Sequence, residues 1–217
     1  LVVHGVNIAS CLSHQSQALP AGITRIGAVN MTNKHTILSA LSQSALAQHA
    51  MPAMDVIANN DDLVGQFNAS LNTVAGTLHR EGGLAALQQA VDELIQQNMQ
   101  VISLLDGIKG NRQVPEIAHD LADIDFAVIP GDLGVAENGA IWVNQPSHRV
   151  TPFICENLIL ALAKDNIVAN MHQAVKQVAL QPGELGLFIA GPSKTADIEQ
   201  ALVVGAHGAC SLNVYLY

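Results

Sequence analysis

The sequence predicts an α/β protein with a mixed, largely parallel sheet, flanking helices and a helical N-terminal part that extends to about residue 98. In three segments between residues 32 and 95, apolar residues recur every three or four positions, which is the period of an amphipathic helix. Beyond residue 100 they gather in uninterrupted runs, which are typical of strands buried on both faces. Helix-like segments separate these runs, and such alternation is typical of α/β layers joined by right-handed crossovers.

Three helices are expected in the first half of the chain. The first runs from residue 32 to about residue 51, and Pro52 ends it. A weaker apolar pattern over residues 60–80 predicts the second helix, which stops at the Glu-Gly-Gly break of residues 81–83. Residues 84–95 show the clearest amphipathic pattern and predict the third.

The second half of the chain is expected to supply the sheet. A further helix is predicted over residues 166–180, with Asp165 as its N-cap. Short apolar runs predict the strands, at residues 101–105, 126–129, 140–143, 158–163, 186–190 and 212–217.

Residues 31–217 are expected to form one domain, and residues 1–30 an extension outside its core. At roughly 150 residues per domain, a chain of 217 residues is long enough for one domain with an extension. Residues 1–30 lack helical periodicity, and Met31 opens a segment that looks like a natural start.

The charge of the chain excludes two classes of partner. Lys and Arg total 9 against 18 Asp and Glu, which gives a net charge of −9. Without a basic cluster, the chain does not attract nucleic acid or an anionic membrane surface. Polar residues interrupt every apolar stretch before it reaches the about 20 residues of a membrane span, and residues 1–24 lack the basic region of a secretory signal. We therefore expect a cytoplasmic protein that binds neither nucleic acid nor a membrane.

The cysteines and histidines form no recognisable metal-binding pattern. Cys11, Cys155 and Cys210 are too few and too scattered for a disulfide framework, and we expect them to be reduced and mostly buried. The nine histidines show neither HxxH nor HExxH spacing, and Cys11 and His14 form a C-x-x-H without a second half. No metal or other cofactor is therefore expected in this chain.

The segment Gly191–Thr195 is a candidate anion-binding loop. It follows an apolar run, and a helix is expected to begin at or just after Ser193 or Thr195. Free N–H groups at a helix N-terminus, two hydroxyls and the Lys194 ammonium would together bind a carboxylate or phosphate. In the alternative interpretation, Ser193 or Thr195 only caps the helix and Lys194 is solvated.

Glu137 is the candidate catalytic residue. It stands directly before Asn138 and Gly139, where a turn would display its carboxylate as a general base or nucleophile. If Glu137 is functional, its turn should face the same pocket as Ser193 and Thr195, at the carboxyl ends of the strands. Alternatively, Asn-Gly is only a hairpin turn and Glu137 is a solvated flank.

Four segments of the chain carry a family resemblance. GPSKTADIE (191–199) and VVGAHGACSLNVYLY (203–217) resemble the C-terminal signature of the LutC/YkgG (LUD-domain) lactate-utilisation proteins. GVAENGAIWV (134–143) and HRVTPFICENLILAL (148–162) are similar to two further family segments, so the resemblance covers about residues 31–217. Two positions depart from the pattern: the usual HGP is His-Gly-Ala at residues 207–209, and Asn157 stands where many members have His.

The resemblance implies a fold like that of the NagB/RpiA/CoA-transferase proteins. It also implies a role in oxidising lactate to pyruvate beside two separate proteins that carry iron–sulfur clusters. Together with the pattern of residues, it gives the expected ligand-binding set: Gly191, Ser193, Lys194, Thr195, Arg149 and His207.

Three functional hypotheses follow. The first is an accessory subunit of a lactate-oxidising system that binds a small carboxylate or a phosphate-bearing ligand. The second is a stand-alone CoA-transferring or isomerising enzyme that uses Glu137, because AENG echoes the Ser-Glu-Asn-Gly turn of CoA-transferases. The third is a scaffold without a ligand. The sequence is also compatible with a homo-oligomer.

Overall fold

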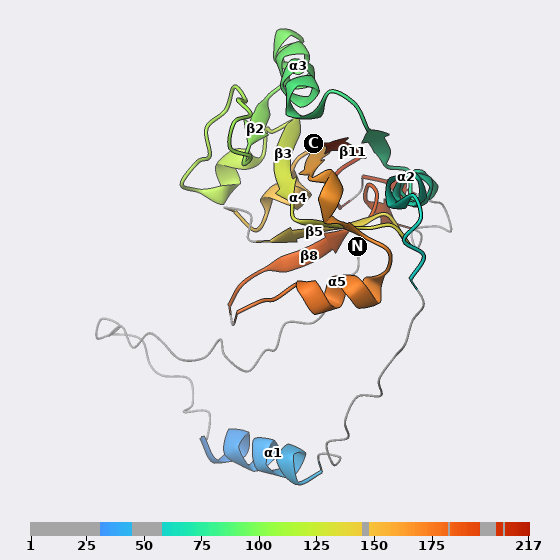
Figure 1. Cartoon of the computed structure of the whole chain (residues 1–217). Coiled ribbons are helices and arrows are strands. Elements are labelled where there is room, and N and C mark those ends of the chain that lie inside the picture. Colours follow the sequence, from blue (N-terminus) through green and yellow to red (C-terminus); the bar gives the residue numbers. More distant parts are fainter. Residues whose placement is uncertain (1–30, 45–57, 145–147, 182, 196–202, 206) are drawn as a thin grey trace, which may run out of the picture. The chain divides into compact units, whose positions relative to one another are not determined.

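The computed structural model describes residues 31–44, 58–144, 148–181, 183–195, 203–205 and 207–217 (Figure 1). These residues fall into two compact units. One contains helix α1 (Met31–Gln43), and the other contains everything described from residue 58 onward. The rest of the first expected helix, residues 45–51, and the expected extension, residues 1–30, lie outside the described residues.

The larger unit is built on the expected parallel sheet. Its strand order is β1-β11-β6-β3-β2, and every neighbouring pair is parallel. The strands are β1 (Thr77–His79), β2 (Val101–Ser103), β3 (Phe126–Gly131), β6 (Asn157–Leu162) and β11 (Ser211–Leu216).

A second, mixed sheet has the order β7-β4-β5-β8. The β4–β5 and β5–β8 pairs are antiparallel, and β4–β7 is parallel. Its strands are β4 (Leu133–Val135), β5 (Ala140–Asn144), β7 (Ile167–Val168) and β8 (Gly186–Ile189). A separate antiparallel pair joins β9 (Lys194–Thr195) to β10 (Val203–Val204).

Alternating side chains of the parallel sheet build two cores. On one face, Ile159 and Val128 pack with Leu87 and Val91 of helix α3 (Gly83–Gln96). On the other face, the second sheet covers the parallel sheet, and helix α2 (Leu63–Thr73) closes this core. The outer face of the second sheet packs against Ala174 of helix α5 (Met171–Gln177). Figure 1 shows α3 and α5 on opposite sides of these layers.

Three short helices complete the described part of the larger unit. They are the 3₁₀ helix η2 (Ala118–Leu121), helix α4 (Thr151–Ile154) and the 3₁₀ helix η3 (Lys164–Asn166).

Two expected helices are shorter in the structure. Helix α2 ends at Thr73 because the chain turns at Ala75, which has a φ of 65°, and Leu78 then lies in β1. The segment expected as one helix over residues 166–180 contains η3, β7 and then α5. The N-cap of α5 is Asn170, whose side chain accepts the Gln173 N–H, and the expectation of Asp165 in that role is wrong.

The core between the two sheets should dominate stability. Leu71 of α2 is fully buried, whereas Leu180 is 41% exposed. Leu71→Ala is expected to lower the free energy of unfolding by about 2–5 kcal/mol, because it removes buried apolar surface and leaves a cavity. The same substitution at Leu180 should cost much less, and urea denaturation of both variants measures the difference. Equal losses for the two variants would contradict this placement of the core.

Candidate functional site

The loop that begins at Gly191 follows a strand, as expected, but it does not begin a helix at Ser193 or Thr195. Lys194 and Thr195 instead form β9, which pairs with β10. The Ser193 N–H donates to the Ala209 carbonyl at 2.9 Å, and the Ser193 carbonyl accepts the Gly205 N–H. A helix therefore does not begin at Ser193, and a helix that begins just after Thr195 would fall in residues 196–202, which lie outside the described residues.

Gly191 and Lys194 both contact the end of helix α2. A Cβ at Gly191, where φ is 75°, would lie 2.1 Å from the carbonyl oxygen of Val74. The ammonium of Lys194 donates to the same oxygen at 2.8 Å. Val74 is the C-cap of α2, and a cation is favourable at the negative end of a helix dipole. Position 191 therefore requires glycine because the backbone of this chain at Val74 approaches it closely.

Three of the expected ligand-binding residues line one small cavity. Gly191, Ser193 and His207 surround a volume of about 20 Å³ together with Pro152 and Phe153. A cavity of this size holds about one water molecule. Leu158, Leu212 and Ile189 also line the cavity. It therefore lies near the amino ends of β6 and β11 of the parallel sheet and at the carboxyl end of β8 of the second sheet.

Lys194, Arg149 and Glu137 do not line this cavity. The exposed Arg149 guanidinium donates to the carbonyl oxygen of Gly183. Glu137 is exposed in the turn between β4 and β5, and its carboxylate accepts the N–H of Met171, at 3.0 Å, where α5 begins. This contact gives Glu137 a structural role, and its use as a catalytic carboxylate stays a prediction.

The turn after Glu137 is an Asn-Gly hairpin turn, as the alternative interpretation of this segment predicts. The Asn138 side chain accepts the Ala140 N–H at 3.0 Å, and Gly139 has a φ of 69°. A Cβ at Gly139 would lie 2.7 Å from the backbone nitrogen of Leu71, so only glycine lets this turn pack on α2.

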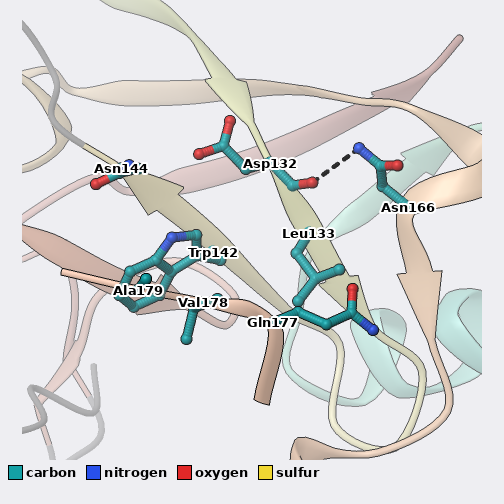
Figure 2. A pocket seen from close by; sticks show the side chains of 8 residues that line it. All are labelled: Asp132, Leu133, Trp142, Asn144, Asn166, Gln177, Val178 and Ala179. Atoms are coloured by element: carbon teal, nitrogen blue, oxygen red, sulfur yellow. Dashed lines mark hydrogen bonds between the residues drawn. The ribbon is translucent and has the colours of Figure 1, made fainter. Parts of the chain in front are cut away.

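A larger pocket lies elsewhere in the second sheet, and none of the sequence motifs predicted it. It is a hollow of about 280 Å³ that is open to solvent, between the β4–β5 hairpin, η3 and the end of α5. Figure 2 shows the side chains that line it: Asp132, Leu133, Trp142, Asn144, Asn166, Gln177, Val178 and Ala179.

Asp132 is the acidic residue of this pocket. It directly follows the carboxyl end of β3, and its carbonyl oxygen accepts a 2.9 Å hydrogen bond from the Asn166 side chain. Its side chain reaches solvent, yet partial desolvation by its neighbours raises the pKa of the carboxyl group. A polar residue directly after a strand of a parallel sheet was the available signal for this site.

The described cysteines differ in burial. Cys155 is buried, and desolvation raises the pKa of its thiol to about 12. Cys210 is exposed, so the expectation of mostly buried cysteines fails there. Among the described residues, no three His, Cys, Asp or Glu side chains gather as a metal site would require, and no described helix is long and apolar enough to cross a membrane.

Comparison with known protein families assigns the chain to one of them. The LUD domain matches residues 31–217. The chain belongs to the LUD-domain family. The crystal structure of a DUF162 family protein from Deinococcus radiodurans is similar to this LUD domain, with a TM-score of 0.54 over 71% of this chain and 96% of that one. At 18% sequence identity, this likeness shows the fold alone.

Curated relatives of this LUD domain share one name. "Lactate utilization protein C" of Shouchella clausii is 32% identical over 114 residues, 49% of this chain and 48% of that protein. The protein of the same name from Geobacillus sp. (strain WCH70) is 35% identical over 116 residues, 49% of this chain and 46% of that protein. The chain thus matches about half the length of each of these relatives.

Asp132→Asn should change stability in a pH-dependent way. The pKa of the folded-state carboxyl is raised above its ordinary value of 3.8, so the partial desolvation of this exposed residue slightly disfavours its ionised form. The resulting loss of folding stability is fully present above the folded-state pKa, and it disappears as the pH falls below the unfolded-state pKa. The variant should therefore have a higher Tm than the wild type at pH 7, with a smaller difference near pH 3. Asp165→Asn controls for the change of charge, and a lower Tm of Asp132→Asn at pH 7 would contradict the assignment.

Proposed function

We propose that this LUD-domain chain acts in lactate utilisation, as a subunit that binds a small carboxylate and works beside iron–sulfur proteins. One observation carries the proposal: the family match over residues 31–217 joins the chain to relatives named "Lactate utilization protein C". These matches span about half of each relative, so the role of the whole relative is extended here to this chain.

The proposed carboxylate seat is the cavity of Gly191, Ser193 and His207. The Ser193 hydroxyl and the exposed His207 ring offer hydrogen-bond donors at one place. A cavity of about 20 Å³ admits one carboxylate oxygen and leaves the rest of the ligand outside. Lys194 follows directly in the chain, and an ammonium has three N–H donors, of which the Val74 carbonyl takes one.

We place the iron–sulfur clusters on partner proteins. Cluster irons are ligated by cysteine thiolates. Cys155 is buried and Cys210 is exposed, and among the described residues no three His, Cys, Asp or Glu side chains gather in one place. Anaerobic affinity purification of this chain from its host is therefore expected to recover iron–sulfur proteins.

Deleting the gene for this chain from its host tests the proposed role directly. Growth on lactate as the sole carbon source should be lost, growth on pyruvate should be normal, and a wild-type copy should restore growth on lactate. Pyruvate enters metabolism after the proposed oxidation step and therefore serves as the control. Unchanged growth on lactate, or an equal defect on both substrates, would refute the proposal.

Calorimetric titration of lactate, pyruvate, phosphate and CoA tests the seat. Ser193→Ala and Lys194→Ala are each expected to weaken lactate binding about tenfold or more, because a hydrogen bond to a charged group contributes about 1.5–3 kcal/mol. Lys194→Ala should also lower stability by about 0.3–1 kcal/mol, because it removes a cation from the end of α2. Lys164→Ala, in η3, is the matched control.

Two outcomes of this titration would contradict the seat. Equal lactate binding by the wild type and both variants would show that the loop only caps α2. Binding of CoA but not of lactate or pyruvate would favour the alternative enzyme that uses Glu137.

A further inference from the structure

We propose that the pocket of Figure 2 is a second binding site, for a small neutral ligand rich in hydroxyl groups, such as a polyol or a simple sugar. Its lining shares no residue with the cavity of Gly191, Ser193 and His207. The two sites are therefore separable by mutation, and this proposal stands apart from the role in lactate utilisation.

The polar lining offers hydrogen-bond donors and acceptors together. The Asp132 carboxylate accepts only, whereas the amides of Asn144, Asn166 and Gln177 both donate and accept. Within the described residues, the side chains of Asn144 and Gln177 make no hydrogen bond, and Asp132 has no ion-pair partner. In Figure 2 the Asp132 carboxylate stands at one side of the pocket and Gln177 at another. These groups are thus free to bind a ligand.

The remaining lining is an apolar wall. Trp142 and Leu133 are each only 7% exposed, and Val178 lies beside them. The indole is held by Phe188, with ring centroids 4.8 Å apart, and by Gly186, where a Cβ would lie 2.1 Å from the indole ring. A fixed aromatic surface next to a few polar groups is typical of small-molecule sites. The C–H groups of a polyol or sugar would contact the small part of this wall that is exposed.

Charge disfavours an anionic ligand in this pocket, and the hydrogen-bond donors of its lining disfavour a cationic one. No Lys, Arg or His lines the pocket in the described part of the chain, and Asp132 supplies a negative charge. A carboxylate or phosphate ligand would give up its hydration without meeting a cation. A cation would meet one carboxylate and the amide oxygens but would use none of the N–H donors of Asn144, Asn166 and Gln177. A hydroxyl group both donates and accepts, and therefore matches the carboxylate and the amides together.

The volume of the pocket limits the size of the ligand. At about 280 Å³ it lies just below the range of about 300–1,000 Å³ that is usual for small-molecule sites. This space suits one pentose, hexose or cyclic polyol.

The single tryptophan of the chain makes this proposal directly testable. Because Trp142 is that residue, its fluorescence and the NMR signal of its indole N–H report on this pocket alone. D-ribose, myo-inositol and glycerol are the neutral probes, and L-lactate and choline are the charged comparisons. At least one neutral probe is expected to shift the indole signal saturably, and neither charged compound should do so.

Variants then test the lining. Asp132→Asn and Gln177→Ala should each weaken binding of the active probe tenfold or more, as measured by the indole shift. Asp165→Asn is the matched control, since it removes an exposed carboxylate beside Asn166 that does not line the pocket. The indole signal without a probe reports whether each variant is folded, and Gln177 is exposed at the end of α5, where truncation leaves the core intact.

Three results would overturn the proposal: no saturable shift with any neutral probe, a shift with lactate or choline alone, or equal affinities of the wild type and both lining variants. None of them bears on the carboxylate seat, which contains no tryptophan and is measured by calorimetry with its own variants.

Discussion

The parallel sheet must be covered on both faces, and the other layers of the larger unit follow from that requirement. Successive residues of β6 serve opposite cores: Leu158 and Leu160 face the second sheet, and Ile159 faces α3. The second sheet then has an outer face of its own, which Ala174 of α5 covers. Because α5 ends at Gln177, it leaves part of the lining near Trp142 open to solvent, and the larger pocket forms there.

The C-terminal half of α2 holds together the segments whose residue types resemble those of a ligand-binding site. The Ser70 hydroxyl donates to the carbonyl of Ala136 at 2.7 Å, directly before Glu137. One turn further along, the Val74 carbonyl accepts the Lys194 ammonium and lies against Gly191. A glycine after a strand and a nearby lysine are as useful for docking a helix end as for binding an anion. Local sequence cannot separate these roles, because the partner, α2, lies more than a hundred residues away.

The fold was predictable where its patterns were long. The run at residues 158–163 and the stripe at residues 84–95 correctly predict β6 and α3, since each spans enough residues to show its period. Strands β4 and β7 have three and two residues, too few for any periodicity, and neither was predictable from the sequence. Leu78 continued the helical spacing by coincidence after the chain had turned at Ala75. Short elements such as these depend on tertiary contacts.

The candidate sites were less predictable than the fold, because each is assembled across the sequence. Ser193 and His207 meet because the loop after β8 lies along the loop before β11: the Ser193 N–H binds the Ala209 carbonyl, and Gly208 leaves room for the Ser193 side chain. The lining of the larger pocket contains both Asp132 and Gln177, which lies 45 residues later at the end of α5. Its charge then separates the two sites chemically. A carboxylate ligand would be repelled by Asp132 in the larger pocket, whereas beside Ser193, Lys194 and His207 it would meet hydrogen-bond donors and a cation. The two proposed sites would therefore differ in the charge of the ligand that each accepts, as well as in size.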